Sequence, residues 1–255
     1  MSLNKYIPNA ITLMNLLSGC IAVVLAVNSY FVASACFIFL GIFFDFFDGF
    51  IARKLNVQSD LGIQLDSLAD MVTSGLAPGV IMFKLITLAS DSTGYSLASW
   101  STFMQWETFK FVPLSIIGLF ITLASAYRLA KFNVDEDQQQ FFKGLPTPAN
   151  TLLIVSLPLI IEFQDNEAMS TMIMNEWFLV GLTLLSCYLL NSNIKLFALK
   201  FNNWSVRDNA IRYIFIVLSL VFLIVLQFAA IPLIILLYIV LSLLSRRSIN
   251  VQVKE

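Results

Sequence analysis

Four aspartates lie between residues 45 and 70, in a very apolar part of the chain, and their spacing predicts a shared pocket. Asp45 and Asp48 fall on one face of a helix, within an arc of roughly 140° that also includes Gly49, Ala52 and Arg53. Asp66 and Asp70 share a face of the helix that would follow. Ionisable side chains are costly in apolar segments, so we expect them to be functional. Clustered carboxylates repel one another unless a cation binds them, and all-oxygen ligand sets suit Mg²⁺, Mn²⁺ or Ca²⁺. The stretch therefore predicts a divalent-metal site.

The same acids also have a plainer interpretation, in which they cap helix ends and face water at a membrane surface. One or two acids would fit that interpretation equally well. Four acids on two consecutive helices, with Asp60 as a fifth nearby, favour the metal site.

The composition restricts the class of protein. The chain has 255 residues, of which 58% are hydrophobic and 12% charged, whereas a soluble domain has about 25% charged residues. This composition predicts a polytopic membrane protein. The net charge of −1 and the lack of a basic block argue against nucleic acid as a partner. The chain has no His, so proton transfer near neutral pH would fall to carboxylates.

Apolar segments of helical length predict an all-α bundle of about eight transmembrane helices. The predicted spans are residues 10–28, 30–54, 63–89, 109–131, 148–163, 176–197, 210–229 and 231–246. The last two are joined at Pro232 with almost no loop, so they could also form one kinked element.

Basic residues predict the orientation of these spans. Thirteen of the 15 Lys and Arg residues fall at the termini or in even-numbered connections, and only Lys84 and Lys110 fall on the other side. By the positive-inside rule, both termini and the aspartates face the cytoplasm, in the cytoplasmic membrane. The second span would be about 36 Å long, which exceeds the hydrocarbon core and brings Arg53 to the headgroups.

The aspartate stretch resembles the signature of the CDP-alcohol phosphotransferase family, D-x2-D-G-x2-A-R-x8-G-x3-D-x3-D. The chain carries every fixed residue of this signature at the family's spacing: Asp45, Asp48, Gly49, Ala52, Arg53, Gly62, Asp66 and Asp70. The resemblance implies transfer of a substituted phosphate from a CDP-linked lipid to an alcohol, with release of CMP.

Three further stretches, residues 70–78, 127–133 and 142–149, resemble the membrane-type phosphatidylserine synthases of that family. The resemblance implies CDP-diacylglycerol and L-serine as substrates, and a homodimer among membrane lipids. The chain departs from this branch at Ser74, where an aromatic residue is common, and at Asn150, where a small residue is common.

The resemblance extends over about residues 6–200, which would form a six-helix catalytic core. Residues 201–255 would then add two transmembrane helices. No repeat or linker divides the chain, so we expect residues 1–255 to form one integral-membrane domain.

The resemblance also assigns roles to particular residues. Asp45, Asp48, Asp66 and Asp70 would bind two divalent ions, Mg²⁺ or Mn²⁺, and Asp70 would also act as the general base. The CDP-lipid site would be lined by Asn9, Thr12, Gly49, Arg53, Ser59 and Gly62.

A serine acceptor also needs a group that binds its carboxylate. Arg128 and Lys131, at the cytoplasmic end of the fourth span, are candidates, and Asn133 would shape the same pocket. Both cations have an alternative role as positive-inside anchors.

Two other functions compete with serine transfer. A sister enzyme would use glycerol 3-phosphate, an inositol phosphate or another alcohol, and a phosphorylated acceptor would need an additional cationic pocket. A cation transporter would use the aspartates as its transport site, but transporters of this kind usually have internal repeats and matching broken helices. The sequence shows neither feature.

Overall fold

The computed structural model describes residues 6–92, 112–134, 142–196 and 209–252. Almost all of the described chain is helical, which confirms the prediction of an all-α membrane bundle. The principal helices are α1 (Tyr6–Val27), α2 (Phe31–Lys54), α3 (Asp60–Asp70), α4 (Ala77–Ser92), α5 (Phe120–Val134), α6 (Thr147–Phe163), α7 (Glu167–Ile173), α8 (Glu176–Asn191), α9 (Ala210–Leu226) and α10 (Ala230–Gln252). Shorter elements are the π-helix η2 (Met71–Leu76), the 3₁₀ helices η3 (Pro113–Leu119) and η5 (Gln227–Ala229), and the paired strands β1 (Phe142–Lys143) and β2 (Lys195–Leu196).

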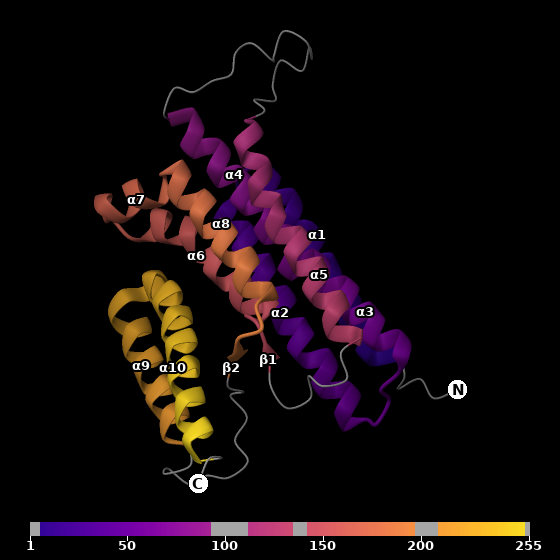
Figure 1. The fold of residues 1–255 in the computed structure, drawn as a ribbon. Helices are drawn as coiled ribbons and strands as arrows, with labels where there is room; N and C mark the ends of the chain where they lie inside the picture. The colour runs from indigo at the N-terminus through magenta and orange to yellow at the C-terminus, as the bar shows by residue number, and fades with distance from the viewer. Residues whose placement is uncertain (1–5, 93–111, 135–141, 197–208, 253–255) are drawn as a thin grey trace.

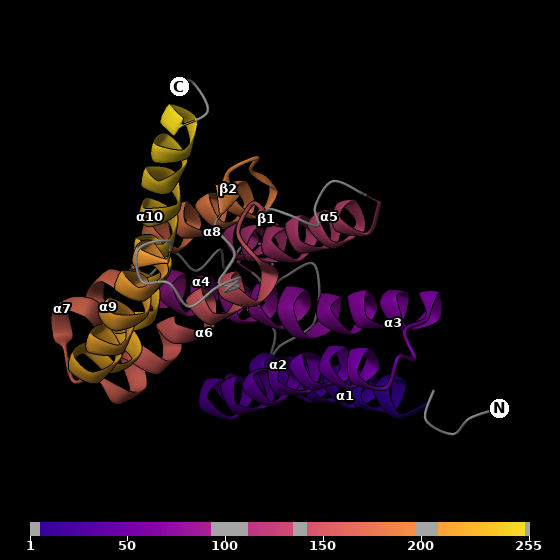
Figure 2. The same cartoon turned by 90° about the horizontal axis from the view of Figure 1, so that it is seen from below.

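The helices α1 and α2 form a hairpin that carries half of the aspartate stretch. Their sequences are apolar almost throughout, as expected for membrane helices. Within the hairpin, the buried hydroxyl of Ser34 donates a hydrogen bond of 2.8 Å to the carbonyl of Ala22. The C-terminal end of α2 lies beside the N-terminal half of α1, where α3 also packs (Figures 1 and 2). The hairpin therefore brings Asp48 close to the start of the chain.

The elements α3, η2 and α4 run on as one span, Asp60–Ser90, of 31 residues. The π-helix begins directly after Asp70, and π-turns are frequent at functional sites. Thr73, inside η2, fits closely against two glycines of the first hairpin. A Cβ atom at Gly41 would lie 2.6 Å from Thr73 Cγ2, and one at Gly19 would overlap Thr73 Oγ1. Glycine at both positions allows three helical backbones to approach closely, as small residues do in membrane bundles.

The buried apolar core lies among α1, α2, α4, α5, α6 and α8. Its largest fully buried members include Ile38, Ile81, Leu85, Ile121 and Ile154. The Gly144–Leu145 segment fixes the start of α6 against the end of α8, because its two amides donate to the carbonyls of Ile194 and Leu189 at 2.9 Å each. Gly144 has φ +76°, and a Cβ there would lie 2.5 Å from the carbonyl oxygen of Leu190, so only glycine fits.

The helices α9 and α10 form a second hairpin beside α6 (Figure 1). The helix α9 ends at η5, where Gln227 has φ +50°, so the junction between α9 and α10 lies there and not at Pro232, where we expected it. The side chain of Gln164, just after α6, binds this turn: its Nε2 donates to the carbonyl of Leu226 at 2.7 Å, and its Oε1 accepts from the amide of Ala229 at 3.2 Å. Spans seven and eight are therefore separate helices.

The predicted count of eight spans is not confirmed. By length and composition, five helical stretches in the described residues can cross a membrane, or six if α7 and α8, bent by 66° at their junction, count as one span. Two features account for the difference. The helix α6 has only 17 residues, and the stretch Ala210–Leu244, which contains both α9 and most of α10, counts once.

Candidate active site

Three of the four aspartates form one ligand group. Asp45 and Asp48 come from α2 and Asp66 comes from α3, and one carboxylate oxygen of each lies within 4.8 Å of the others. Asp48 is buried, and the Oδ1 atom of Asp66 is buried without a hydrogen-bond partner. Buried oxygens without partners are rare and costly. This all-oxygen set fits a divalent cation such as Mg²⁺ or Mn²⁺.

Asp70 lies beside this group, one helical turn after Asp66. Its carboxylate is near enough to that of Asp45 for the two negative charges to repel each other. It also accepts a hydrogen bond of 3.3 Å from Asn15 Nδ2 on α1. The structure thus places the fourth predicted aspartate next to the other three, with one of its oxygens held from a different helix.

The amide of Asn15 is itself held in one orientation. Thr73 Oγ1 lies 2.8 Å from Asn15 Oδ1 and 3.1 Å from the carbonyl oxygen of Asn15, and its hydroxyl hydrogen can donate to either. Donation to Oδ1 fixes which end of the amide is the oxygen, and this turns the NH₂ group toward Asp70. Asn15 is 0% exposed and Thr73 1%. Neither residue has a role predicted from the sequence, although an amide within an apolar span is a usable signal.

All six residues predicted for the CDP-lipid site line one cavity of about 230 Å³. These residues are Asn9, Thr12, Gly49, Arg53, Ser59 and Gly62, and Asp48 and Asp66 also line it. The cavity therefore joins directly onto the carboxylate group.

Local contacts shape this cavity. Thr12 Oγ1 donates to Asp48 Oδ2 at 2.5 Å, which links α1 to the carboxylate group. Ser59 caps α3 by accepting a hydrogen bond of 3.1 Å from the amide of Gly62. A Cβ at Gly62 would lie 3.2 Å from Ser59 Oγ and 3.3 Å from Asn9 Oδ1, so a side chain there would crowd the cavity wall.

The three predicted acceptor residues separate in the structure. Arg128 is buried between α5 and α6, with its Nη1 atom 3.5 Å from Thr147 Oγ1. Its guanidinium interacts electrostatically with Asp70. Lys131 and Asn133 are exposed, and Asn133 Nδ2 donates to Ser67 Oγ at 2.9 Å. Only Arg128 is therefore close to the carboxylates.

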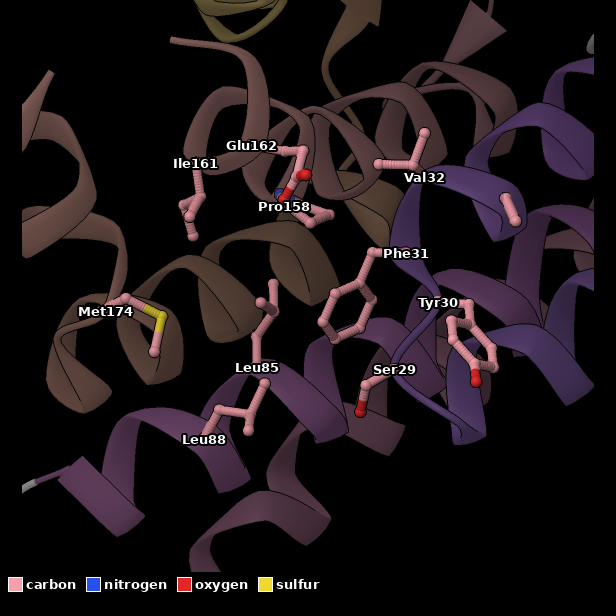
Figure 3. Close-up of a pocket in the computed structure, with 11 residues that line it drawn as sticks. Ser29, Tyr30, Phe31, Val32, Leu85, Leu88, Pro158, Ile161, Glu162 and Met174 are labelled. Carbon is pink, nitrogen blue, oxygen red and sulfur yellow. The ribbon is translucent and has the colours of Figure 1, made fainter. Parts of the chain in front are cut away.

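A larger cavity, of about 590 Å³, lies at the opposite end of α2 (Figure 3). Its lining comes from the α1–α2 turn, α4, α6 and Met174, and includes Phe31, Leu85 and Pro158. Glu162 is the one titratable acid in this lining. The cavity is mainly apolar and distant from the aspartates, so we assign no chemistry to it.

The fold and these residues define an integral membrane protein with a carboxylate site suited to divalent cations. Comparison with known proteins gives the family. The family model described as CDP-alcohol phosphatidyltransferase matches residues 5–188, and the chain belongs to this family. The family generally uses divalent cations.

Three relatives, all named CDP-diacylglycerol–serine O-phosphatidyltransferase, are similar over most of the same region. The Bacillus subtilis protein is 35% identical over 153 residues, which cover 60% of this chain and 75% of that protein. The Helicobacter pylori protein is 29% identical over 217 residues, covering 84% and 81%. The Methanocaldococcus jannaschii protein is 30% identical over 168 residues, covering 66% and 68%.

Proposed function

We propose that this protein transfers the phosphatidyl group of CDP-diacylglycerol to the hydroxyl of L-serine, giving phosphatidylserine and CMP. The main observation behind the proposal is that one cavity is lined both by the six residues predicted to bind CDP and by Asp48 and Asp66 of the carboxylate group. The names of the relatives support serine as the acceptor.

The CDP moiety occupies the cavity between α1, α2 and α3. Gly49 leaves room for the nucleotide, because the nearest atom to a Cβ at this position would be Arg53 Nη2 at 3.8 Å. Arg53 is exposed at the end of α2, where its planar guanidinium can donate two hydrogen bonds to a phosphate. Asn9, Thr12, Ser59 and Gly62 form further parts of the wall.

Asp45, Asp48, Asp66 and Asp70 would hold two divalent cations, Mg²⁺ or Mn²⁺. Cations bound there would supply positive charge against the pyrophosphate and the CMP leaving group. Thr12 orients Asp48, and Asn15 orients Asp70.

Asp70 accepts the proton from the serine hydroxyl. The hydroxyl oxygen attacks the phosphorus on the lipid side of the pyrophosphate, a new P–O bond forms, and the bond to the CMP oxygen breaks. Arg128 binds the carboxylate of serine, because it is the buried cation beside Asp70. Lys131 and Asn133 stand further out, at the exposed end of α5.

The proposal includes an arrangement in the membrane. Both termini and the carboxylate group face the cytoplasm, as the basic residues favour, and the protein resides in the cytoplasmic membrane. Residues 6–200 form the catalytic core of a single domain, residues 201–255 are an addition to it, and the protein is a homodimer.

Release of CMP from CDP-diacylglycerol, measured with and without L-serine in detergent micelles, tests this function. We expect release to require both L-serine and a divalent cation, to stop on chelation, and to fall to background in Asp70→Asn. Asp60→Asn is the matched control, because Asp60 begins the same helix but is exposed and outside the ligand group. Equal release without serine, or full activity of Asp70→Asn, would refute the proposal.

A further inference from the structure

Unpaired buried polar atoms are concentrated at one place beside the carboxylates. Nine buried side-chain nitrogen or oxygen atoms in the described residues have no hydrogen-bond partner. Five of them belong to just four residues, Ser74, Ser125, Arg128 and Asn150, and Asn150 contributes both Nδ2 and Oδ1. Such atoms are costly in any protein interior and more so within a membrane. Such a concentration needs partners that the protein itself does not supply, and a bound polar ligand is one way to supply them.

These four residues come from three elements, η2, α5 and α6, and η2 packs against both helices. Thr151, next to Asn150, donates to the carbonyl of Ser74 at 2.9 Å, so this turn of α6 packs on η2. Ser125 Cβ lies 3.2 Å from the position of a Cβ on Gly75, so α5 packs on the same turn. The 3.5 Å contact between Arg128 and Thr147 closes the α5–α6 side.

This polar group adjoins the reacting carboxylate. Ser74 follows Asp70 by four residues, which is close to one turn of the π-helix. The guanidinium of Arg128 interacts electrostatically with Asp70. All four residues are nine-tenths buried or more: Ser125 and Asn150 are 0% exposed, Ser74 1% and Arg128 9%. A ligand held by them would therefore lie within reach of Asp70 and away from bulk solvent.

The chemistry of the unpaired atoms selects the class of ligand. Arg128 Nε and Asn150 Nδ2 donate, Asn150 Oδ1 accepts, and the two serine hydroxyls can do both. A carboxylate and an ammonium on one small molecule would satisfy this set. The group contains a single cation, which balances one carboxylate but not a phosphate dianion. Lys131 and Arg53, the other predicted substrate-binding cations, are exposed.

We propose that Ser74, Ser125, Arg128 and Asn150 form the subsite for the zwitterionic head of an amino-acid acceptor. Asn150, where this branch commonly has a small residue, is the specificity-determining residue particular to this chain, since its amide can bind both the carboxylate and the ammonium. This inference rests on the proposed function and identifies which groups distinguish an amino acid from a phosphorylated alcohol.

Steady-state kinetics of Asn150→Leu test the subsite, because leucine branches at Cγ like asparagine, has the same number of side-chain heavy atoms and lacks both polar atoms. We expect the KM for L-serine to rise roughly 10- to 100-fold, the effect of losing hydrogen bonds to charged groups, while the KM for CDP-diacylglycerol stays within about twofold. Ser219→Ala is the matched control: Ser219 also carries a buried unpaired oxygen but lies on α9, outside the group. An unchanged KM for L-serine in Asn150→Leu overturns the proposal.

A comparison of acceptors on the unmodified enzyme gives a second test that does not depend on the folding of a variant. L-serine should support CMP release far better than ethanolamine or L-serine methyl ester, which lack the carboxylate. Equal use of these analogues overturns the subsite but leaves phosphatidyl transfer intact. Release driven by glycerol 3-phosphate and not by serine overturns both the subsite and the proposed acceptor.

Discussion

The hydroxyl of Thr73 should be required for activity, although it lies outside the family signature and is fully buried. The informative perturbation is the pair Thr73→Val and Thr73→Ser. Valine keeps the branched shape of threonine and removes the hydroxyl, whereas serine keeps the hydroxyl and removes the methyl group. If Thr73 acts by orienting Asn15 toward Asp70, serine will substitute for it and valine will not.

The magnitude follows from the contacts that valine would remove. Without the 2.8 Å hydrogen bond, Asn15 Oδ1 is left buried and unpaired, which costs about 1–3 kcal/mol. Nothing then prevents the amide from turning over, and an oxygen in place of Nδ2 would repel the Asp70 carboxylate. If most of this free energy appears in the transition state, kcat falls roughly 10- to 100-fold, at about 1.36 kcal/mol per factor of ten.

Initial rates of serine-dependent CMP release, with each substrate varied in turn, provide the assay. We expect the kcat of Thr73→Val to fall as above while the KM for CDP-diacylglycerol changes by less than about twofold, since Thr73 does not line the cavity proposed for the nucleotide. Thr73→Ser should keep its kcat within a factor of about three. The thermal unfolding midpoint of each variant in detergent reports whether it is folded.

This explanation is refuted if Thr73→Val is more active than Thr73→Ser. If Thr73 contributed only packing against Gly19 and Gly41, the isosteric valine would be active and the smaller serine would be impaired. A folded Thr73→Val with normal kcat would show that the Asn15 amide needs no such restraint.

Three further predictions concern the packing, the nucleotide site and the second hairpin. Gly41→Ala should lower both kcat and the thermal unfolding midpoint, because the added Cβ would lie 2.6 Å from Thr73 Cγ2. The control is Gly181→Ala, whose added Cβ would have no atom within 4 Å; it should leave the stability unchanged or raise it by up to about 1 kcal/mol. Arg53→Lys should raise the KM for CDP-diacylglycerol several-fold without changing the KM for serine, because lysine cannot donate two parallel hydrogen bonds to a phosphate. The control is Lys54→Gln, which alters an adjacent exposed cation outside the cavity and should leave both KM values unchanged. Gln227→Gly should raise the thermal midpoint, because φ +50° with ψ −121° strains any residue but glycine by about 1–3 kcal/mol; a lower midpoint would contradict the strain.

Composition and spacing were sufficient to predict several features correctly. The apolar composition predicted a helical membrane protein, and the structure and family comparison agree. Helical periodicity predicted that Asp45 and Asp48 would share one helical face and Asp66 and Asp70 another, because residues three or four apart on a helix share a face. The structure brings three of these four, Asp45, Asp48 and Asp66, into one ligand group. The roles of these residues in metal and CDP binding remain predictions.

The sequence could not predict which polar residues from distant segments would meet. Asn15 lies 55 residues from Asp70 and 58 from Thr73, and only the packing of α1 against α3 and η2 brings them into contact. Similarly, Gln227 carries no local signal for a chain reversal, since glutamine does not favour positive φ. The break there is maintained by Gln164 of a different segment.

The residues predicted to bind the acceptor show most clearly the difference between what the sequence predicts and what the tertiary structure decides. From sequence, Arg128 and Lys131 were both candidates, two cations at one helix end that could either bind the acceptor or serve as positive-inside anchors. The tertiary structure separates them, because α6 covers Arg128 and leaves Lys131 exposed. Local spacing determined which carboxylates could share a face, since one helix fixes those positions by itself. Only the packing of three helices decided which cation is buried beside Asp70, because burial depends on neighbours that are distant in the chain.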